Sequence, residues 1–212
     1  MEKKIYVVFS STPYQTGKLI RKLTGSQYNH VSIALDRDLS QMFSFARRYY
    51  RTPLYGGFVK ESLSRYHIDG KPSLCMICEI PVSTAQYAAL ERKLNEMHAH
   101  KEQYIYNYLS LLAIPFGRRI QVREALLCVE FVSDILSQLD TPVVSGKFYT
   151  VKTLSTLLES FTVYSGTMPA PVEYDRAYFA PKPVPHPFLA SLRNIFALFP
   201  RLHKTGEKTA LK

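Results

Sequence analysis

The sequence predicts a single α+β domain, with a small antiparallel sheet packed against a helix that opens on a cysteine. Several short runs of β-branched and apolar residues are typical of strands, and longer stretches carry apolar residues at helical spacing. At 212 residues, of which 46% are hydrophobic, the chain is long enough for one full core. No break in composition indicates a second globular domain.

Five segments have the composition of strands: residues 5–10, 28–35, 41–47, 73–82 and 161–167. His30 stands at the entrance of the second strand. The second and third strands are close enough in sequence to form a hairpin. We therefore expect a residue of the third strand to lie beside His30.

Four segments have helical spacing: residues 16–23, 83–100, 126–139 and 150–158. Ser83 is a plausible N-cap of the second helix, and Gln86 three positions later completes a capping box. Residues 104–116 are rich in aromatic and aliphatic side chains. We expect them to pack against the 126–139 helix, either as core or as the wall of an apolar pocket. The run Tyr55-Gly56-Gly57-Phe58 is expected to be a turn, because glycine adopts positive φ without strain.

Cys128 and His30 are the candidate chemical residues. Cys128 lies in the first turn of the 126–139 helix, where backbone N–H groups and the helix dipole favour a thiolate. A neutral imidazole beside it would complete a nucleophile and base pair. The alternative is structural, with Cys128 a small core residue and His30 an ordinary hydrogen-bonded side chain.

Four blocks of sequence occur in a characteristic order: Asn29-His30-Val31-Ser32-Ile33, then residues 42–47, then 56–61, then Cys128-Val129-Glu130-Phe131-Val132. In this order they resemble the circularly permuted branch of the NlpC-type papain-like cysteine peptidases and amidases. The YiiX-like proteins are the nearest kin we suggest, and the lecithin retinol acyltransferases are more distant. Unpermuted members place the cysteine helix before the histidine strand, whereas here the histidine comes first. The resemblance extends from about Ile5 to Met168 and is specific in the histidine and cysteine blocks.

The resemblance implies a permuted papain-like fold with a catalytic dyad. Cys128 would attack a carbonyl, His30 would take and return the proton, and the backbone N–H of Cys128 would face the oxyanion. A polar group of the neighbouring strand would orient the imidazole. Ser44 is the residue we assign to this role. Gln41, on the opposite face of that strand, stays the alternative.

The implied reaction is acyl transfer from an amide or ester, to water or to another amine or alcohol. A peptide, a murein fragment and an acylated amine or lipid are all candidate substrates. No cofactor or metal is expected. Cys75 and Cys78 form a C-x-x-C pair, but on a strand they face opposite sides, and no second Cys or His pair is near to complete a zinc site.

An odd number of cysteines without a dense pattern favours a reducing compartment. The apolar run after Met1-Glu2-Lys3-Lys4 is too short for a signal peptide or a membrane span. We therefore expect a cytoplasmic protein. Residues 1–168 would form the catalytic domain, 169–187 a Pro-rich strap and 188–212 a basic amphipathic segment.

The formal net charge is +10, and both ends of the chain are basic. Such ends favour anionic partners, although charge runs are also common on solvated surfaces. The 188–212 segment could lie on an anionic membrane or dock on the body of the protein. Nucleic acid is not expected, because the basic-aromatic run at 47–51 has no accompanying motif. Two other function classes stay open: a binding module with an unused dyad, and a protein that associates with an anionic membrane or polymer through its basic ends.

Overall fold

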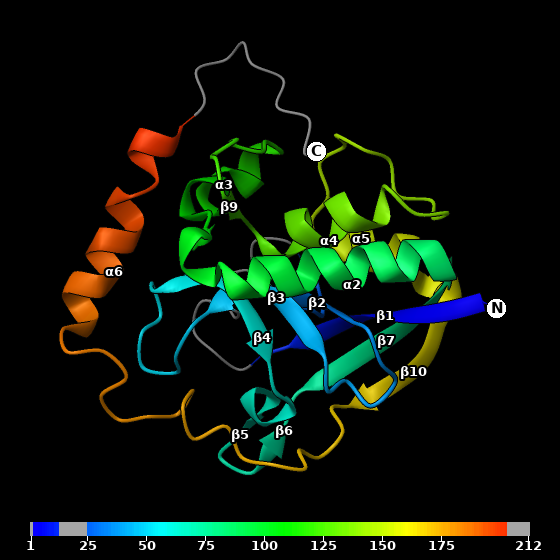
Figure 1. Cartoon of the computed structure of the whole chain (residues 1–212), viewed down its shortest axis with the longest axis horizontal. Helices are drawn as coiled ribbons and strands as arrows, with labels where there is room; N and C mark the ends of the chain where they lie inside the picture. Colours follow the sequence, from blue (N-terminus) through cyan, green and yellow to red (C-terminus); the bar gives the residue numbers. More distant parts are fainter. Residues whose placement is uncertain (1, 13–24, 203–212) are drawn as a thin grey trace.

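The computed structural model describes residues 2–12 and 25–202 of the chain. Its centre is a six-stranded sheet with the strand order β10-β7-β1-β2-β3-β4, and every neighbouring pair is antiparallel (Figure 1). The strands are β1 (Glu2–Ser11), β2 (His30–Ala34), β3 (Met42–Arg47), β4 (Gly56–Glu61), β7 (Leu74–Ser83) and β10 (Thr162–Thr167). Two small pairs lie outside it: β5 (His67–Ile68) with β6 (Lys71–Pro72), and β8 (Ile105–Tyr106) with β9 (Ala125–Leu126). The predicted α+β class with an antiparallel sheet is confirmed.

The described α-helices are α2 (Thr84–Ala99), α3 (Tyr108–Ala113), α4 (Cys128–Leu136), α5 (Val151–Leu157) and α6 (Pro187–Phe196). Short 3-10 turns are η1 (Leu63–Tyr66), η2 (Lys101–Gln103), η3 (Ile114–Phe116), η4 (Glu159–Phe161) and η5 (Phe199–Arg201). The expected capping box is present at the start of α2, where Gln86 N donates to Ser83 Oγ and Ser83 N donates to Gln86 Oε1. The helix expected over residues 16–23 lies outside the described residues.

Helices α2, α4 and α5 cover one face of the sheet (Figure 1). Side chains alternate between the two faces of a strand, so Phe43 and Phe45 of β3 and Phe58 of β4 point to this side. Phe131 of α4 packs between them, with ring centroids 5.5 Å from both Phe45 and Phe58. This aromatic cluster fixes α4 across the middle of the sheet.

The strap covers part of the other face. Met168, the residue before the strap, is buried there against Tyr6 and Val8 of β1, and Tyr178 within the strap is 2% exposed. Further along, the backbone carbonyl of Tyr178 accepts a hydrogen bond from Tyr50 N, and Asp175 pairs with Arg65 at 3.4 Å. The predicted Pro-rich strap therefore holds to the body of the protein through buried and charged contacts.

The C-terminal segment docks on the body as far as Leu202. Asn194 Nδ2 donates to the carbonyl of Gly56 at 3.2 Å, Leu198 is fully buried, and Arg201 Nη1 donates to the carbonyl of Gln103 at 2.7 Å. Of the two placements that the sequence left open, the structure shows this docking. Among residues 2–12 and 25–202, no helix is long and apolar enough to cross a bilayer.

The turn expected at residues 55–58 is wrong. Gly56 and Gly57 are strand residues at the start of β4, and neither has a positive φ. They are required by close packing, since a Cβ at Gly57 would lie 2.2 Å from the carbonyl oxygen of Tyr104 and one at Gly56 would lie 2.9 Å from Cβ of Tyr106. Glycine therefore lets β4 approach the 104–106 segment.

Candidate active site

The structure brings Cys128 and His30 together. Each residue begins its element: Cys128 opens α4 and His30 opens β2, and α4 packs across β2 and β3. The two side chains lie close enough for the sulfur of Cys128 to help raise the pKa of His30. Cys128 is only 4% exposed, so this contact is shielded from bulk solvent.

The start of α4 is fixed by its own residues. Leu127 is the N-cap, and its backbone N–H donates to the carboxylate of Glu130 at 2.8 Å. The N–H groups of the first helical turn have no carbonyl four residues earlier within the helix to bind. The backbone N–H of Cys128 is one of these groups, next to the sulfur.

Glu61 is the residue that holds the imidazole. Nε2 of His30 lies 2.9 Å from Oε1 of Glu61, whose side chain is almost completely buried. Because Nε2 faces the carboxylate, Nδ1 is the ring nitrogen left for the sulfur of Cys128. The three side chains therefore form a thiol, imidazole and carboxylate in series.

Three hydroxyl groups hold the carboxylate of Glu61. Ser44 Oγ donates to Oε1 at 2.8 Å, Ser32 Oγ donates to Oε2 at 2.6 Å, and the hydroxyl of Tyr66 also donates to Oε2. Burying a carboxylate is costly unless it is paired and hydrogen-bonded. Here every contact partner of Glu61 is a donor, so the charge is compensated within the site.

Ser44, the residue that the sequence assigns to orienting His30, donates to the carboxylate of Glu61 and not to the imidazole itself. It shares a face of the sheet with Glu61, since Met42, two positions earlier, pairs with Glu61 across β3 and β4. Gln41, the alternative, precedes β3, and its backbone N–H donates to Asp36.

Burial and charge act in opposite directions on the pKa of His30. Burial lowers it, but the carboxylate of Glu61 and the sulfur of Cys128 outweigh burial and raise the pKa to about 10. Burial likewise raises the pKa of Glu61, yet the neighbouring His30 outweighs it and lowers the pKa to about 2. At neutral pH the pair is therefore an imidazolium and a carboxylate.

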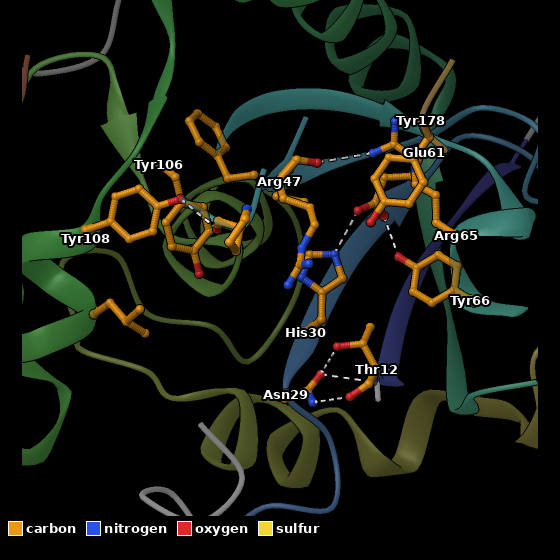
Figure 2. Close-up of a pocket in the computed structure, with 14 residues that line it drawn as sticks. Thr12, Asn29, His30, Arg47, Glu61, Arg65, Tyr66, Tyr106, Tyr108 and Tyr178 are labelled. Carbon is orange, nitrogen blue, oxygen red and sulfur yellow. Dashed lines mark hydrogen bonds and ion pairs between the residues drawn. The ribbon is translucent and has the colours of Figure 1, made fainter. Parts of the chain in front are cut away.

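A pocket of about 90 Å³ opens beside His30. Figure 2 shows Glu61 and Tyr66 on one side of the imidazole and Tyr106 and Tyr108 on the other. Burial, and after it the nearby sulfur of Cys128, raise the pKa of Tyr106 well above its usual value. The remaining wall residues are Thr12, Asn29, Phe45, Ala46, Arg47, Pro53, Arg65, Leu111 and Tyr178.

A smaller apolar hollow touches the sulfur itself. It is lined by Cys128 together with Asn29, Tyr106, Leu111, Ile114, Leu127, Val129, Thr150 and Val151. Asn29, Tyr106 and Leu111 line both this hollow, which we call the recess, and the larger pocket, whereas Cys128 lines only the recess. Residues 104–116, for which the sequence left core and pocket wall open, contribute to both walls and also pack against the core.

The other cysteines belong to the core. Cys75 and Cys78 point to opposite faces of β7, as the sequence predicts, and burial raises the pKa of each thiol to about 11. Arg119, upstream of Cys128 in the sequence, forms a two-pronged pair with Asp134, at 3.0 and 2.8 Å.

Sequence reasoning did not assign Glu61 or Tyr66 to the site. Glu61 is the last residue of β4, which begins with the two glycines. Because those glycines were interpreted as a turn, no strand was predicted at Glu61. A signal was present, because a strand paired with residues 42–47 would place a carboxylate near Ser44 and His30. No protein-family model, no curated protein and no solved structure matches this chain.

Proposed function

We propose that the protein is a thiol hydrolase or acyltransferase that cleaves an amide or ester, with a permuted papain-like arrangement of its catalytic elements. The observation that carries the proposal is the series Cys128, His30 and Glu61, with His30 in contact with both partners. A nucleophile, a base in hydrogen-bond contact with it and a third group that orients the base are the parts that covalent acyl transfer requires.

In the first step the sulfur of Cys128 attacks the carbonyl carbon of the substrate. In the proposed step the attacking form is the thiolate, with the imidazolium of His30 as its counter-ion. The C–S bond forms, the carbonyl C–N or C–O bond breaks, and His30 gives its proton to the leaving amine or alcohol. The product held on the protein is a thioester.

In the second step water, or another amine or alcohol, attacks the thioester. Neutral His30 takes the proton from the attacking group, the C–S bond breaks, and the acyl group leaves as an acid or as a new amide or ester. Glu61 accepts from Nε2 of His30 throughout, so it fixes the ring and stabilises the imidazolium. Glu61 is not itself required to gain a proton.

Two donors are placed to stabilise the oxyanion. The backbone N–H of Cys128 lies at the positive end of α4, where helix N–H groups have no intrahelical acceptor. The second donor is the hydroxyl of Tyr106, a residue that lines both the pocket at His30 and the recess at Cys128. Donors of this kind contribute strongly when they face developing charge in a water-poor site.

The pocket at His30 suits a polar or aromatic part of the substrate, because it contains several tyrosines together with Arg47 and Arg65. The recess at Cys128 is lined mainly by aliphatic side chains and, at about 10 Å³, has room only for a small apolar group. Peptides and acylated amines with a polar or aromatic leaving group both meet this description.

The test is the capture of an acyl group on Cys128. The full-length protein is mixed with a p-nitrophenyl acyl ester, the release of nitrophenol is followed, and the acylated peptide is mapped by mass spectrometry. We expect a burst of nitrophenol and an acyl group on Cys128 in the wild type. Cys128→Ala and His30→Ala should abolish the burst.

Cys75→Ala is the matched control, because Cys75 is a buried thiol that lies on the opposite face of the sheet. It should keep the burst unless the fold is lost, which circular dichroism would show. Acylation of Cys75 or Cys78 in place of Cys128 would contradict the proposal. A folded protein that never acylates Cys128 but binds small amides in the pocket would instead be a binding module.

The three cysteines of the chain are free thiols. A cytoplasmic location would keep Cys128 reduced and ready to react. We propose this location on that chemical ground alone.

A further inference from the structure

Helix α6 buries its polar side and exposes its apolar side. Ser191 and Asn194 are 8% and 6% exposed, whereas Phe188 and Phe196 are 78% and 64% exposed. A helix on the surface of a water-soluble domain normally has the reverse arrangement. The inversion is built into the contacts, because Asn194 anchors the helix to the carbonyl of Gly56.

The exposed apolar residues form one stripe. Phe188, Leu192, Phe196 and Phe199 follow one another at intervals of four, four and three residues, the spacing of a single helix face. Leu192 is half-buried, while the phenylalanines are exposed, and the rings of Phe196 and Phe199 lie 6.4 Å apart. We call these four residues the α6 stripe. A contiguous exposed patch of this kind marks an interaction surface.

The stripe lies at the rim of the molecule. In Figure 1, α6 lies at the edge of the molecule, on the side opposite to β10, and Asn194 anchors it to the start of β4. Only Ser191, Asn194 and Leu198 of this segment are fully buried against the body. A flat surface could therefore approach the stripe without disturbing the sheet or α4.

The charge around the stripe is positive. Arg193 is exposed on α6 itself, and Lys182 is exposed in the chain that leads into it. Between residues 182 and 202 there is no acidic residue. Exposed phenylalanines flanked by lysine and arginine are the composition of helices that lie in a membrane interface.

We propose that the α6 stripe docks the protein on an anionic lipid surface. The phenylalanines enter the boundary between headgroups and acyl chains, and the flanking cations bind the lipid phosphates. A second copy of the chain fits less well, because a symmetric contact would bring Arg193 and Lys182 of one copy close to the same residues of the other. The proposal does not depend on the acyl-transfer chemistry, since none of these residues belongs to the Cys128 site.

The test uses fluorescence, because the chain contains no tryptophan. Phe196→Trp places a single indole in the stripe. Val163→Trp is the matched control, since Val163 is 56% exposed and lies on β10. With vesicles of phosphatidylcholine and phosphatidylglycerol, the emission of Phe196→Trp should shift to the blue and that of Val163→Trp should not. With pure phosphatidylcholine the shift should be much smaller.

Vesicle flotation of the full chain measures the affinity. The double variant Phe188→Ser with Phe196→Ser should bind anionic vesicles at least about tenfold more weakly than wild type, because it lacks the two phenylalanines that would be buried in the lipid. Raising the salt to 1 M should weaken the wild type as well. Absence of binding, binding that the double variant retains, or equal binding to neutral vesicles would overturn the proposal. So would a dimer that the double variant abolishes, since it would identify a second copy as the occupant.

Discussion

Nε2 of His30 and Oε1 of Glu61 lie 2.9 Å apart in a buried ion pair that joins β2 to β4 across β3. The pair links the sheet to the candidate nucleophile, because the same imidazole contacts Cys128 of α4. The imidazole of His30, which joins two strands through Glu61, is thus also the group that would transfer the proton in the proposed reaction.

Glu61→Gln should lower the acylation rate with little change in the fold. The amide is close in shape to the carboxylate but lacks its charge, so the imidazolium of His30 loses its main stabilising partner. We expect a fall of about 100-fold, within the usual range for general acid–base groups. The burst of the nitrophenyl ester assay measures it.

Glu79→Gln is the control for that variant. Glu79 is a more exposed glutamate, paired with Lys4 at 2.6 Å on the surface of the sheet. Surface ion pairs contribute little, so the variant should react as fast as wild type. Equal rates for Glu61→Gln and wild type would show that the carboxylate does not support catalysis.

Ser44→Ala should mainly affect stability. It removes one of three hydroxyl donors to the carboxylate of Glu61 and leaves His30 in place. A hydrogen bond to a charged group contributes about 1.5–3 kcal/mol, and we expect a loss near the lower end of that range in urea unfolding. The acylation rate should fall by less than in Glu61→Gln. A larger fall would return to Ser44 the orienting role that the sequence assigned to it.

The stabilising effect of His30 should depend on pH with a definite sign. Its pKa is raised from 6.5 to about 10 in the folded protein, so its contribution is fully present below pH 6.5 and is lost as the pH rises through 10. The difference in unfolding free energy between wild type and His30→Ala should therefore be larger at pH 6 than at pH 9.5. An increase over that range would contradict the assigned charge state.

The contribution of Glu61 to stability should be lost at low pH, in contrast to that of His30. The pKa of Glu61 is lowered from 4.5 to about 2, so its contribution is present above pH 4.5 and is lost as the pH falls toward 2. The free energy of unfolding should be larger for wild type than for Glu61→Gln, and this difference should shrink as the pH falls from 4.5 to 2. Urea unfolding at a series of pH values records this. A difference that stays constant would mean that the pair is not ionised.

Gly57→Ala should destabilise the protein by about 3 kcal/mol or more, because the added Cβ would collide with the backbone carbonyl of Tyr104. Gly70→Ala is the comparison. Gly70 has a φ of +72° and open space around it, so only backbone strain of about 1–2 kcal/mol is expected. If Gly57→Ala proves the milder change, the close packing of β4 on the 104–106 segment would be contradicted.

Local patterns predicted the elements that later form the site. The start of α4 at Cys128, the strand at His30 and the opposite placement of Cys75 and Cys78 all follow from periodicity within one segment. Periodicity within residues 41–47 also places Ser44 and Gln41 on opposite faces, and Ser44 lies on the face that carries Glu61. Such features depend on neighbours a few residues apart, which a single sequence displays.

The third member of the site depends on contacts that the sequence displays less directly. Glu61 reaches His30 only because β4 pairs with β3 along its whole length. Gly56 and Gly57 permit that pairing, because they have no Cβ that would collide with the 104–106 segment. Read locally, two adjacent glycines indicate a turn. The same local evidence could not show that the outer face of α6 would be the apolar one, since this depends on which side Asn194 anchors.

The most direct measurement of the central claim is the rate at which iodoacetamide alkylates Cys128 at pH 6, compared between wild type and His30→Ala with the modified peptide mapped. An imidazolium beside the sulfur should make wild type at least about tenfold faster. That advantage should shrink toward pH 10, where His30 loses its proton. Equal rates at pH 6, or faster modification of Cys75 or Cys78 than of Cys128, would contradict the account.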